Sequence, residues 1–105
     1  TSCEVAWQGN DRLSLYRGHH LQQLTTDHVM EIGYGQKMLT RCLKGGGLRD
    51  DVPTKNIPLQ TADILFLCTD GFYNIHEQEL SPGNAIAPKE GIMTDDATCL
   101  TIKIN

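Results

Sequence analysis

Hydrophobic and polar residues alternate near both ends of the chain. Residues 3–7 place a cysteine, a valine and a tryptophan at every second position, and residues 100–104 do the same with a leucine and two isoleucines. A period of two is typical of strands with one buried face. The spacing predicts strands at residues 3–7, 13–15, 21–24 and 100–104. Turn-forming residues at Gly9 and Asn10 predict that the first two strands form a hairpin.

The pattern changes to helical spacing between residues 26 and 43. Thr26 or Asp27 is a suitable N-cap for a short helix that continues to Ile32. Apolar residues within 38–43 share one face of a second helix, and three consecutive glycines at 45–47 would end it. The polar segment 48–61 contains two prolines and predicts a loop with at most one edge strand.

A continuous hydrophobic run, residues 64–68, is followed by Thr69, Asp70 and Gly71. Such a run predicts a strand that is covered on both faces. Asp70 would then stand on a rigid support at the edge of a cleft, beside a glycine that permits close approach. The alternative interpretation is that Asp70 and Gly71 form an ordinary turn after the strand.

Two more carboxylates, Asp95 and Asp96, come shortly before the last predicted strand. Carboxylates that converge in a cleft repel each other unless a cation offsets their charge. Short aspartate side chains suit hard ions such as Mg²⁺ or Mn²⁺. The alternative interpretation is a solvated turn.

Composition limits the possible classes of protein. At 105 residues, with 39% hydrophobic and 21% charged residues, the chain is typical of a single soluble domain. A net charge of −4 with scattered basic residues argues against nucleic-acid binding. The sequence contains no apolar run of membrane-helix length and no signal-peptide pattern, so we expect a cytoplasmic protein without a membrane partner. Because the chain begins at Thr1, we expect a piece of a longer protein.

The cysteines and histidines do not predict a site. The four cysteines are far apart, so buried reduced thiols are favoured over a zinc site. No histidine has a neighbouring pattern that would make it a metal ligand or a general acid, and we expect all four to be turn or surface residues. These residues are Cys3, Cys42, Cys68 and Cys99, with His19, His20, His28 and His76.

Five short motifs occur in an order that is informative although no single one is. The chain resembles the C-terminal half of the type 2C protein phosphatases, the metal-dependent serine/threonine phosphatases, whose patterns are G-D-S-R, L-T-x-D-H, L-T-R-x-L, D-x-L-L-L-C-S-D-G-L and D-N-x-T. The matching segments here are Gly9-Asn10-Asp11-Arg12, Leu24-Thr25-Thr26-Asp27-His28, Leu39-Thr40-Arg41-Cys42-Leu43, residues 63–72 and Asp95-Asp96-Ala97-Thr98.

The resemblance implies a fold and a function. The fold would be α+β, with antiparallel sheet layers and flanking helices: part of the family's αββα sandwich, formed by residues 1–105 as one incomplete domain. The function would be hydrolysis of phosphoserine or phosphothreonine in a phosphoprotein by metal-activated water. Asp70 and Asp95 match metal ligands for a two-metal Mg²⁺ or Mn²⁺ site that this chain supplies only in part, and Gly71 and Asp96 lie beside them. Arg12 matches an arginine that we expect to be structural.

The chain also departs from the family pattern. G-D-S-R is replaced by G-N-D-R, Asp96 stands where asparagine is usual, and nothing matches the family's N-terminal metal-binding segment. We therefore expect that the parent protein is the enzyme and that this chain alone is inactive. Exposed sheet edges in a half domain would favour self-association. Two alternatives stay open: a non-catalytic phosphatase-like binding module, and an unrelated small α/β protein whose acids lie in turns.

Overall fold

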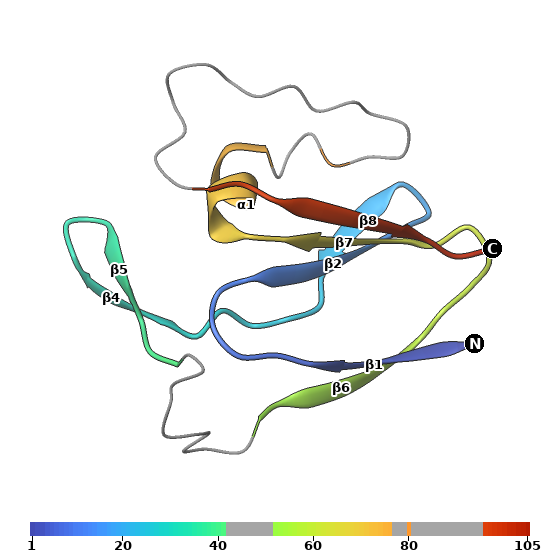
Figure 1. Ribbon diagram of the computed structural model, residues 1–105, viewed down its shortest axis with the longest axis horizontal. Helices are drawn as coiled ribbons and strands as arrows, with labels where there is room; N and C mark the ends of the chain where they lie inside the picture. The colour runs from blue at the N-terminus through green and yellow to red at the C-terminus, as the bar shows by residue number, and fades with distance from the viewer. Residues whose placement is uncertain (42–51, 77–79, 81–95) are drawn as a thin grey trace.

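The computed structural model describes residues 1–41, 52–76, 80 and 96–105, and these residues form three antiparallel sheets (Figure 1). The largest sheet has the strand order β3-β2-β7-β8. Its strands are β2 (Arg12–Arg17), β3 (His20–Gln23), β7 (Ile64–Cys68) and β8 (Cys99–Lys103). The two smaller sheets pair β1 (Ser2–Ala6) with β6 (Thr54–Pro58), and β4 (Val29–Gly33) with β5 (Gln36–Leu39). A single helix, α1 (Asp70–His76), is found within the described residues.

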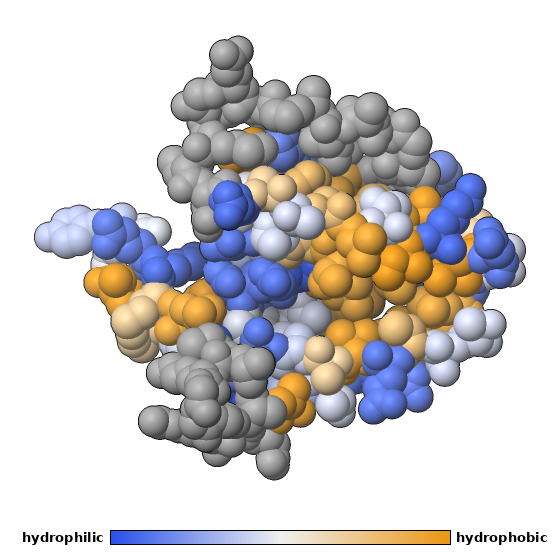
Figure 2. All heavy atoms as spheres, in the orientation of Figure 1, coloured by the Kyte–Doolittle hydropathy of each residue, from blue (hydrophilic) through white to orange (hydrophobic). Residues whose placement is uncertain are grey.

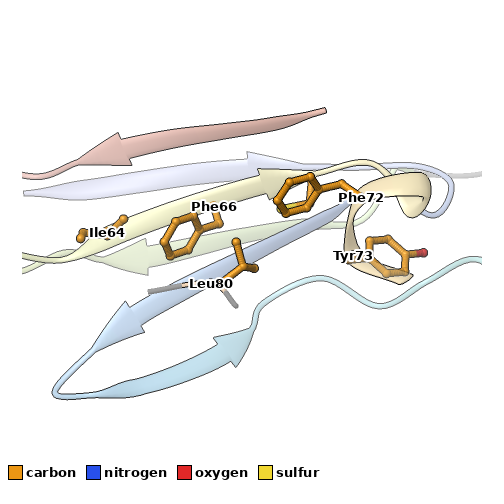
Figure 3. Close-up of a cluster of buried hydrophobic side chains, with 6 residues drawn as sticks. Ile64, Phe66, Phe72, Tyr73 and Leu80 are labelled. Atoms are coloured by element: carbon orange, nitrogen blue, oxygen red, sulfur yellow. The ribbon is translucent and has the colours of Figure 1, made fainter. Parts of the chain in front are cut away.

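Strand β7 distributes its side chains between two hydrophobic clusters because successive residues of a strand point to opposite faces. On one face Ile64 and Phe66 pack with Phe72 and Tyr73 of α1 (Figure 3). On the other face Leu65 packs with residues of β2 and with Ile57 of β6. Figure 1 shows α1 and the β1–β6 pair on opposite sides of the four-stranded sheet. Strand β7, which leads to Asp70, therefore packs against other elements on both faces.

The prediction of a buried strand at residues 64–68 is confirmed, with one exception. Leu67 is 42% exposed although its neighbours on β7 are buried. The β1–β6 pair covers Leu65, which packs in the same cluster as Ile57, but it leaves Leu67 exposed. The last strand is also confirmed, as β8, and a short third strand forms at His20–Gln23.

The predicted hairpin between the first two strands is wrong. β1 pairs with β6, with Cys3 opposite Ile57, and β2 pairs with β3 and β7. The turn at Gly9 separates the two strands into different sheets rather than joining them. Local alternation predicts a strand, but it does not identify a partner that lies fifty residues away in sequence, roughly the separation of these pairs.

The predicted α+β fold class, an αββα sandwich with flanking helices, is wrong for the described chain, which is mostly strand. Residues 29–32, expected in the first helix, lie in β4, and Met38 and Leu39, expected on the second, lie in β5. Tyr34 and Gly35 have φ angles of 52° and 72° and reverse the chain between the two strands. Cross-strand pairing then replaces helical packing. The remainder of the second predicted helix, with Cys42 and Leu43, lies outside the described residues.

An ion pair between the buried Asp63 and the partly exposed Arg17 joins the start of β7 to the end of β2. The Asp63 carboxylate, 2% exposed, accepts hydrogen bonds from Arg17 Nε at 2.9 Å and Arg17 Nη2 at 2.6 Å. The backbone N–H of Gln60 donates a third, at 2.7 Å. The hydrogen bonds from Arg17 hold the pKa of Asp63 at about 2, so the carboxylate is ionised at neutral pH.

Within the described residues, no helix is long and apolar enough to cross a bilayer.

Candidate functional site

Asp70 lies at the junction of β7 and α1, as the first residue of the helix. It is partly buried, and both of its carboxylate oxygens accept hydrogen bonds. Oδ1 accepts from the backbone N–H of Gly71 at 2.9 Å, and Oδ2 accepts from Asn10 Nδ2 at 3.1 Å. The bond from Asn10 links the loop between β1 and β2 to the end of β7. Asp70 therefore has a fixed orientation, which an ordinary exposed turn residue lacks.

Arg12 and Tyr73 hold this loop in place. Arg12 forms a bidentate pair with Asp27, in which Nη2 lies 2.7 Å from Oδ2 and Nε lies 3.1 Å from Oδ1. The guanidinium carbon lies 3.7 Å from the centre of the Tyr73 ring. The Tyr73 hydroxyl donates to the Asn10 carbonyl at 2.8 Å. Arg12 therefore makes contacts that fit the structural role predicted for it.

Tyr73 acts as a hydrogen-bond donor over the whole physiological pH range. Burial is the main cause that raises its pKa to about 12, and the negative charge of Asp27 adds to the effect. Because the phenol keeps its proton, its bond to the Asn10 carbonyl persists. The position of the Asn10 amide against Asp70 is thus supported from α1 as well as from the loop itself.

His28 and Gly9 join the G-N-D-R segment to the T-T-D-H segment. The Gly9 N–H donates to His28 Nδ1 at 3.0 Å, and the His28 N–H donates to the Gly9 carbonyl at 2.9 Å. Gly9 has a φ of 105°, which strongly favours glycine. The expectation that all four histidines are turn or surface residues is wrong for His76, which is 1% exposed in α1. His28 is partly buried and is bonded to this loop.

Sequence reasoning missed Asn10 and Asp11 as neighbours of Asp70. Burial, and then the negative charge of Asp70, raise the pKa of Asp11. Asp11, the acid of the G-N-D-R motif, is thus close enough to Asp70 for the Asp70 charge to affect the ionisation of Asp11. This holds although the acid is shifted by one position from its place in G-D-S-R. Both acids belong to the motifs that match the family pattern, Asp11 to the G-N-D-R segment and Asp70 to the segment that matches S-D-G. The sequence therefore contained a signal that the two acids lie close together.

The other predicted site residues are placed as follows. Gly71 is buried and supplies the N–H that contacts Asp70. Asp96 is exposed, and its carbonyl oxygen lies 3.5 Å from Thr69 Oγ1, so its backbone reaches the residue before Asp70. Asp95 lies outside the described residues. Convergence of Asp70 with Asp95 stays a prediction.

A pocket of about 430 Å³ opens beside Asp70. Asn10 and Asn74 line it near Asp70, and Lys37 and Leu39 line it from the β4–β5 hairpin. Figure 2 shows hydrophilic residues gathered where this hairpin meets the body of the molecule. Lys37 forms no ion pair within the described residues. Besides Arg12 and Asp27, which pair with each other, the pocket therefore holds the acid Asp70 and the basic Lys37 on different elements. This combination suits a ligand that carries both signs of charge.

The described residues fit a metal ion only in part. No group of three or more His, Cys, Asp or Glu side chains that could hold a metal is found among them. Asp70 supplies carboxylate oxygens of the kind that Mg²⁺ and Mn²⁺ prefer, and Asp11 is a second acid nearby. The Asn10 amide already donates to one Asp70 oxygen. A complete set of ligands requires other residues.

Comparison with known proteins is informative at the level of the fold. No protein-family model and no curated protein matches the chain. A solved structure described as PppA, a key regulatory component of T6SS in Pseudomonas aeruginosa, matches 70% of this chain with a TM-score of 0.60 and 23% sequence identity. The chain spans 33% of the length of that structure. The comparison indicates that the chain shares the fold of part of that structure.

Proposed function

We propose that this chain is the C-terminal part of a metal-dependent protein serine/threonine phosphatase. The observation that carries the proposal is Asp70, an acid oriented by Asn10 at the end of a buried strand and open to a pocket. The type 2C-like fold supports the same assignment at a coarser level. The substrate is phosphoserine or phosphothreonine in a phosphoprotein.

In this proposal Asp70 and Asp95 contribute ligands to a site for two Mg²⁺ or Mn²⁺ ions. Such ions lower the pKa of bound water and offset charge on phosphoryl oxygens. The chain's own residues have positioning roles. Asn10 and the Gly71 N–H orient the Asp70 carboxylate, while Arg12 and Tyr73 hold the loop that carries Asn10.

Lys37 is suited to bind the substrate. It lines the same pocket as Asp70 but comes from β5, so its ammonium group can approach a phosphate bound in that pocket. An ammonium group forms strong charge-assisted hydrogen bonds with phosphate oxygens. The pocket volume of about 430 Å³ is adequate for a phosphorylated side chain.

The chain alone would be inactive in this proposal. Its described residues supply too few ligands for a metal site, and it corresponds to one third of the length of PppA. The remaining ligands and a phosphate-binding arginine would come from sequence that precedes Thr1. The exposed hydrophobic side chains on β7 and β8 would then be covered either by that sequence or, when it is missing, by a second copy of the chain.

The test is Mn²⁺-dependent hydrolysis of a phosphoserine peptide by two proteins, this chain alone and a longer version that carries the sequence preceding Thr1. Activity in the longer protein only would support the proposal. Inactivity in both would favour a non-catalytic phosphatase-like module. Calorimetric titration of both proteins with Mn²⁺ would separate failure to bind metal from failure to turn over substrate.

A further inference from the structure

Two cysteines face each other across the strands that lead to the candidate site. Cys68 ends β7 and Cys99 begins β8, and the register places them directly opposite each other. Their sulfur atoms lie 3.3 Å apart. Neither takes part in the function proposed above. Both are reduced thiols in this structure.

The hydrogen-bond pattern of the two strands favours a covalent link at this position. The Thr69 N–H donates to the Thr98 carbonyl at 3.0 Å, and the Ile104 N–H donates to the Asp63 carbonyl at 2.9 Å. Opposed residues in an antiparallel ladder alternate between hydrogen-bonded and non-hydrogen-bonded pairs. Counting from either bond makes Cys68 and Cys99 a non-hydrogen-bonded pair. In such pairs the α-carbons lie about 4.5 Å apart, within the range that a disulfide spans.

The two thiols differ in access to solvent. Cys99 is partly exposed, whereas Cys68 is 3% exposed and packs in the cluster with Phe66 and Phe72. An oxidant in solution reaches Cys99 first. Cys68 is then the neighbouring thiol that can resolve the oxidised sulfur, which is the arrangement found in redox-sensitive cysteine pairs.

We propose that Cys68 and Cys99 are a modification site at which a peroxide forms a disulfide across β7 and β8. In the first step Cys99 sulfur attacks hydrogen peroxide, which gives a sulfenic acid and releases one water. In the second step Cys68 sulfur attacks that sulfenic acid, which forms the S–S bond and releases a second water. The two thiols lose two electrons and two protons, and the peroxide is reduced to two waters.

The position of this link gives it a structural consequence. Thr69, next to Cys68, accepts a hydrogen bond at Oγ1 from the Thr98 N–H at 3.0 Å, and Asp70 follows directly. β8 is an edge strand of the four-stranded sheet, so one side of it has no neighbour within that sheet. A disulfide at this end would fasten the edge strand to β7 immediately before Asp70. Oxidation would therefore restrain the segment that carries the candidate acids, without touching them.

The experiment compares the full chain under dithiothreitol with the full chain after treatment with equimolar hydrogen peroxide. Tryptic cleavage after Lys55, Lys89 and Lys103 places Cys68 and Cys99 on separate peptides, each with no other cysteine. The expected product is one crosslinked pair of these peptides, lighter by two hydrogens than their sum, that dithiothreitol separates. The melting temperature of the oxidised chain should rise by several degrees, because the link closes a long loop in the unfolded chain.

Two variants make the outcome specific. Cys99→Ser, at the more exposed position, should abolish the crosslink and the rise in melting temperature, whereas Cys3→Ser should leave both unchanged. A crosslink that involves Cys3 or Cys42 instead, or no crosslink in the unsubstituted chain, would overturn the proposal. A Cys68–Cys99 crosslink that lowers the melting temperature would also overturn it, because the folded sheet would then not accommodate the bond. None of these outcomes depends on phosphatase activity.

Discussion

Asp70 is held by hydrogen bonds from two separate segments, Asn10 in the loop before β2 and Gly71 in α1. The Asp70→Asn substitution replaces one carboxylate oxygen with an NH2 group, which removes the negative charge that favours binding of a divalent cation. We expect Asp70→Asn to reduce Mn²⁺-dependent turnover in the longer protein by about 100-fold or more, with the fold intact. The rate of phosphoserine peptide hydrolysis and the far-UV circular dichroism spectrum measure the two effects.

Asp96→Asn is the matched control for that substitution. Asp96 is exposed, and asparagine is the residue usual at this position in the family that the sequence resembles. Turnover should therefore be retained in Asp96→Asn. Equal rates for Asp70→Asn and the unsubstituted protein would contradict the assignment of Asp70.

Substitution of Lys37 tests whether the pocket beside Asp70 binds the phosphate of the substrate. Lys37→Met keeps most of the side-chain volume but removes the positive charge, so we expect KM for a phosphoserine peptide to rise about tenfold while kcat changes less. Lys103→Met, on the edge strand β8, is the control and should leave KM unchanged. A lower kcat with an unchanged KM for Lys37→Met would argue against substrate binding by this residue.

Asp63 predicts a specific dependence of stability on pH. Its pKa is about 2 in the folded chain, below the ordinary value of 3.8, because Arg17 donates hydrogen bonds to the ionised form. A lowered pKa stabilises the folded state above the ordinary value, and this stabilisation is lost as the pH falls through the folded value. The window is therefore between about pH 4 and pH 2.

The comparison of Asp63→Asn with the unsubstituted chain isolates this effect from that of the other carboxylates. At pH 7 the variant should melt several degrees lower, since a neutral amide at this position carries no charge to pair with Arg17. Melting curves recorded from pH 7 down to pH 2 should show the gap closing below pH 4. A gap that stays constant over this range would mean that ionisation of Asp63 does not stabilise the fold.

At the scale of single residues, the sequence predicted the position of Asp70 at the end of a buried strand but not the contacts that orient it. Asp70 could be found because a continuous apolar run ends there, which is a local signal. Asn10 lies sixty positions away and meets Asp70 only through the pairing of β2 with β7. Nothing in the spacing of either segment states that pairing, so a contact of this kind requires a structure.

Among the elements, β7 contributes buried side chains to both hydrophobic clusters. Leu65 and Leu67 lie on the same face of β7, but Leu65 is 3% exposed and Leu67 is 42% exposed. We expect Leu65→Ala to lower the free energy of unfolding by about 2–5 kcal/mol, because the lost contacts leave a cavity. Leu67→Ala should cost much less. Urea denaturation of both variants gives the two values.

The same two residues show where the β1–β6 pair stops covering the sheet. If the two substitutions cost equal amounts, then Leu67 is buried in solution by something other than the described residues. That result would itself identify a covered face. A small cost for Leu65→Ala would instead contradict the packing of β7 against Ile57.

At the level of elements, strands were predicted better than helices for a physical reason. β2, β7 and β8 carry their own alternating or continuous apolar pattern, and all three form where expected. Residues 26–39 have apolar spacing that suits either a short helix or a two-stranded hairpin. The hairpin forms because Tyr34 and Gly35 have positive φ angles that make a tight turn. Short apolar segments are ambiguous in this way when the turn is not recognised.

At the scale of the whole molecule, one hydrophobic area has no cover within the described residues. Leu67 pairs across the strands with Leu100, and Leu65 pairs with Ile102, so these side chains lie on one face of β7 and β8. Leu67, Leu100 and Ile102 are exposed. A hollow of about 430 Å³ separates this face from β1 and is lined by Val5, Leu67 and Ile102 among others. Figure 2 shows hydrophobic residues gathered over the strands of the body.

The combination of an apolar face with sheet edges at β1 and β8 favours association of this chain with itself. We expect the isolated chain to form oligomers whose proportion rises with concentration, as measured by sedimentation velocity. Ile102→Lys should shift the distribution toward the monomer, because a charge on this face would be desolvated on association. Lys103→Ile adds an apolar residue on the opposite face of the same strand. It is the control that shows whether association depends on the face that carries Ile102 or on the edge of β8. A monodisperse monomer at every concentration would show that this face and these edges do not drive association.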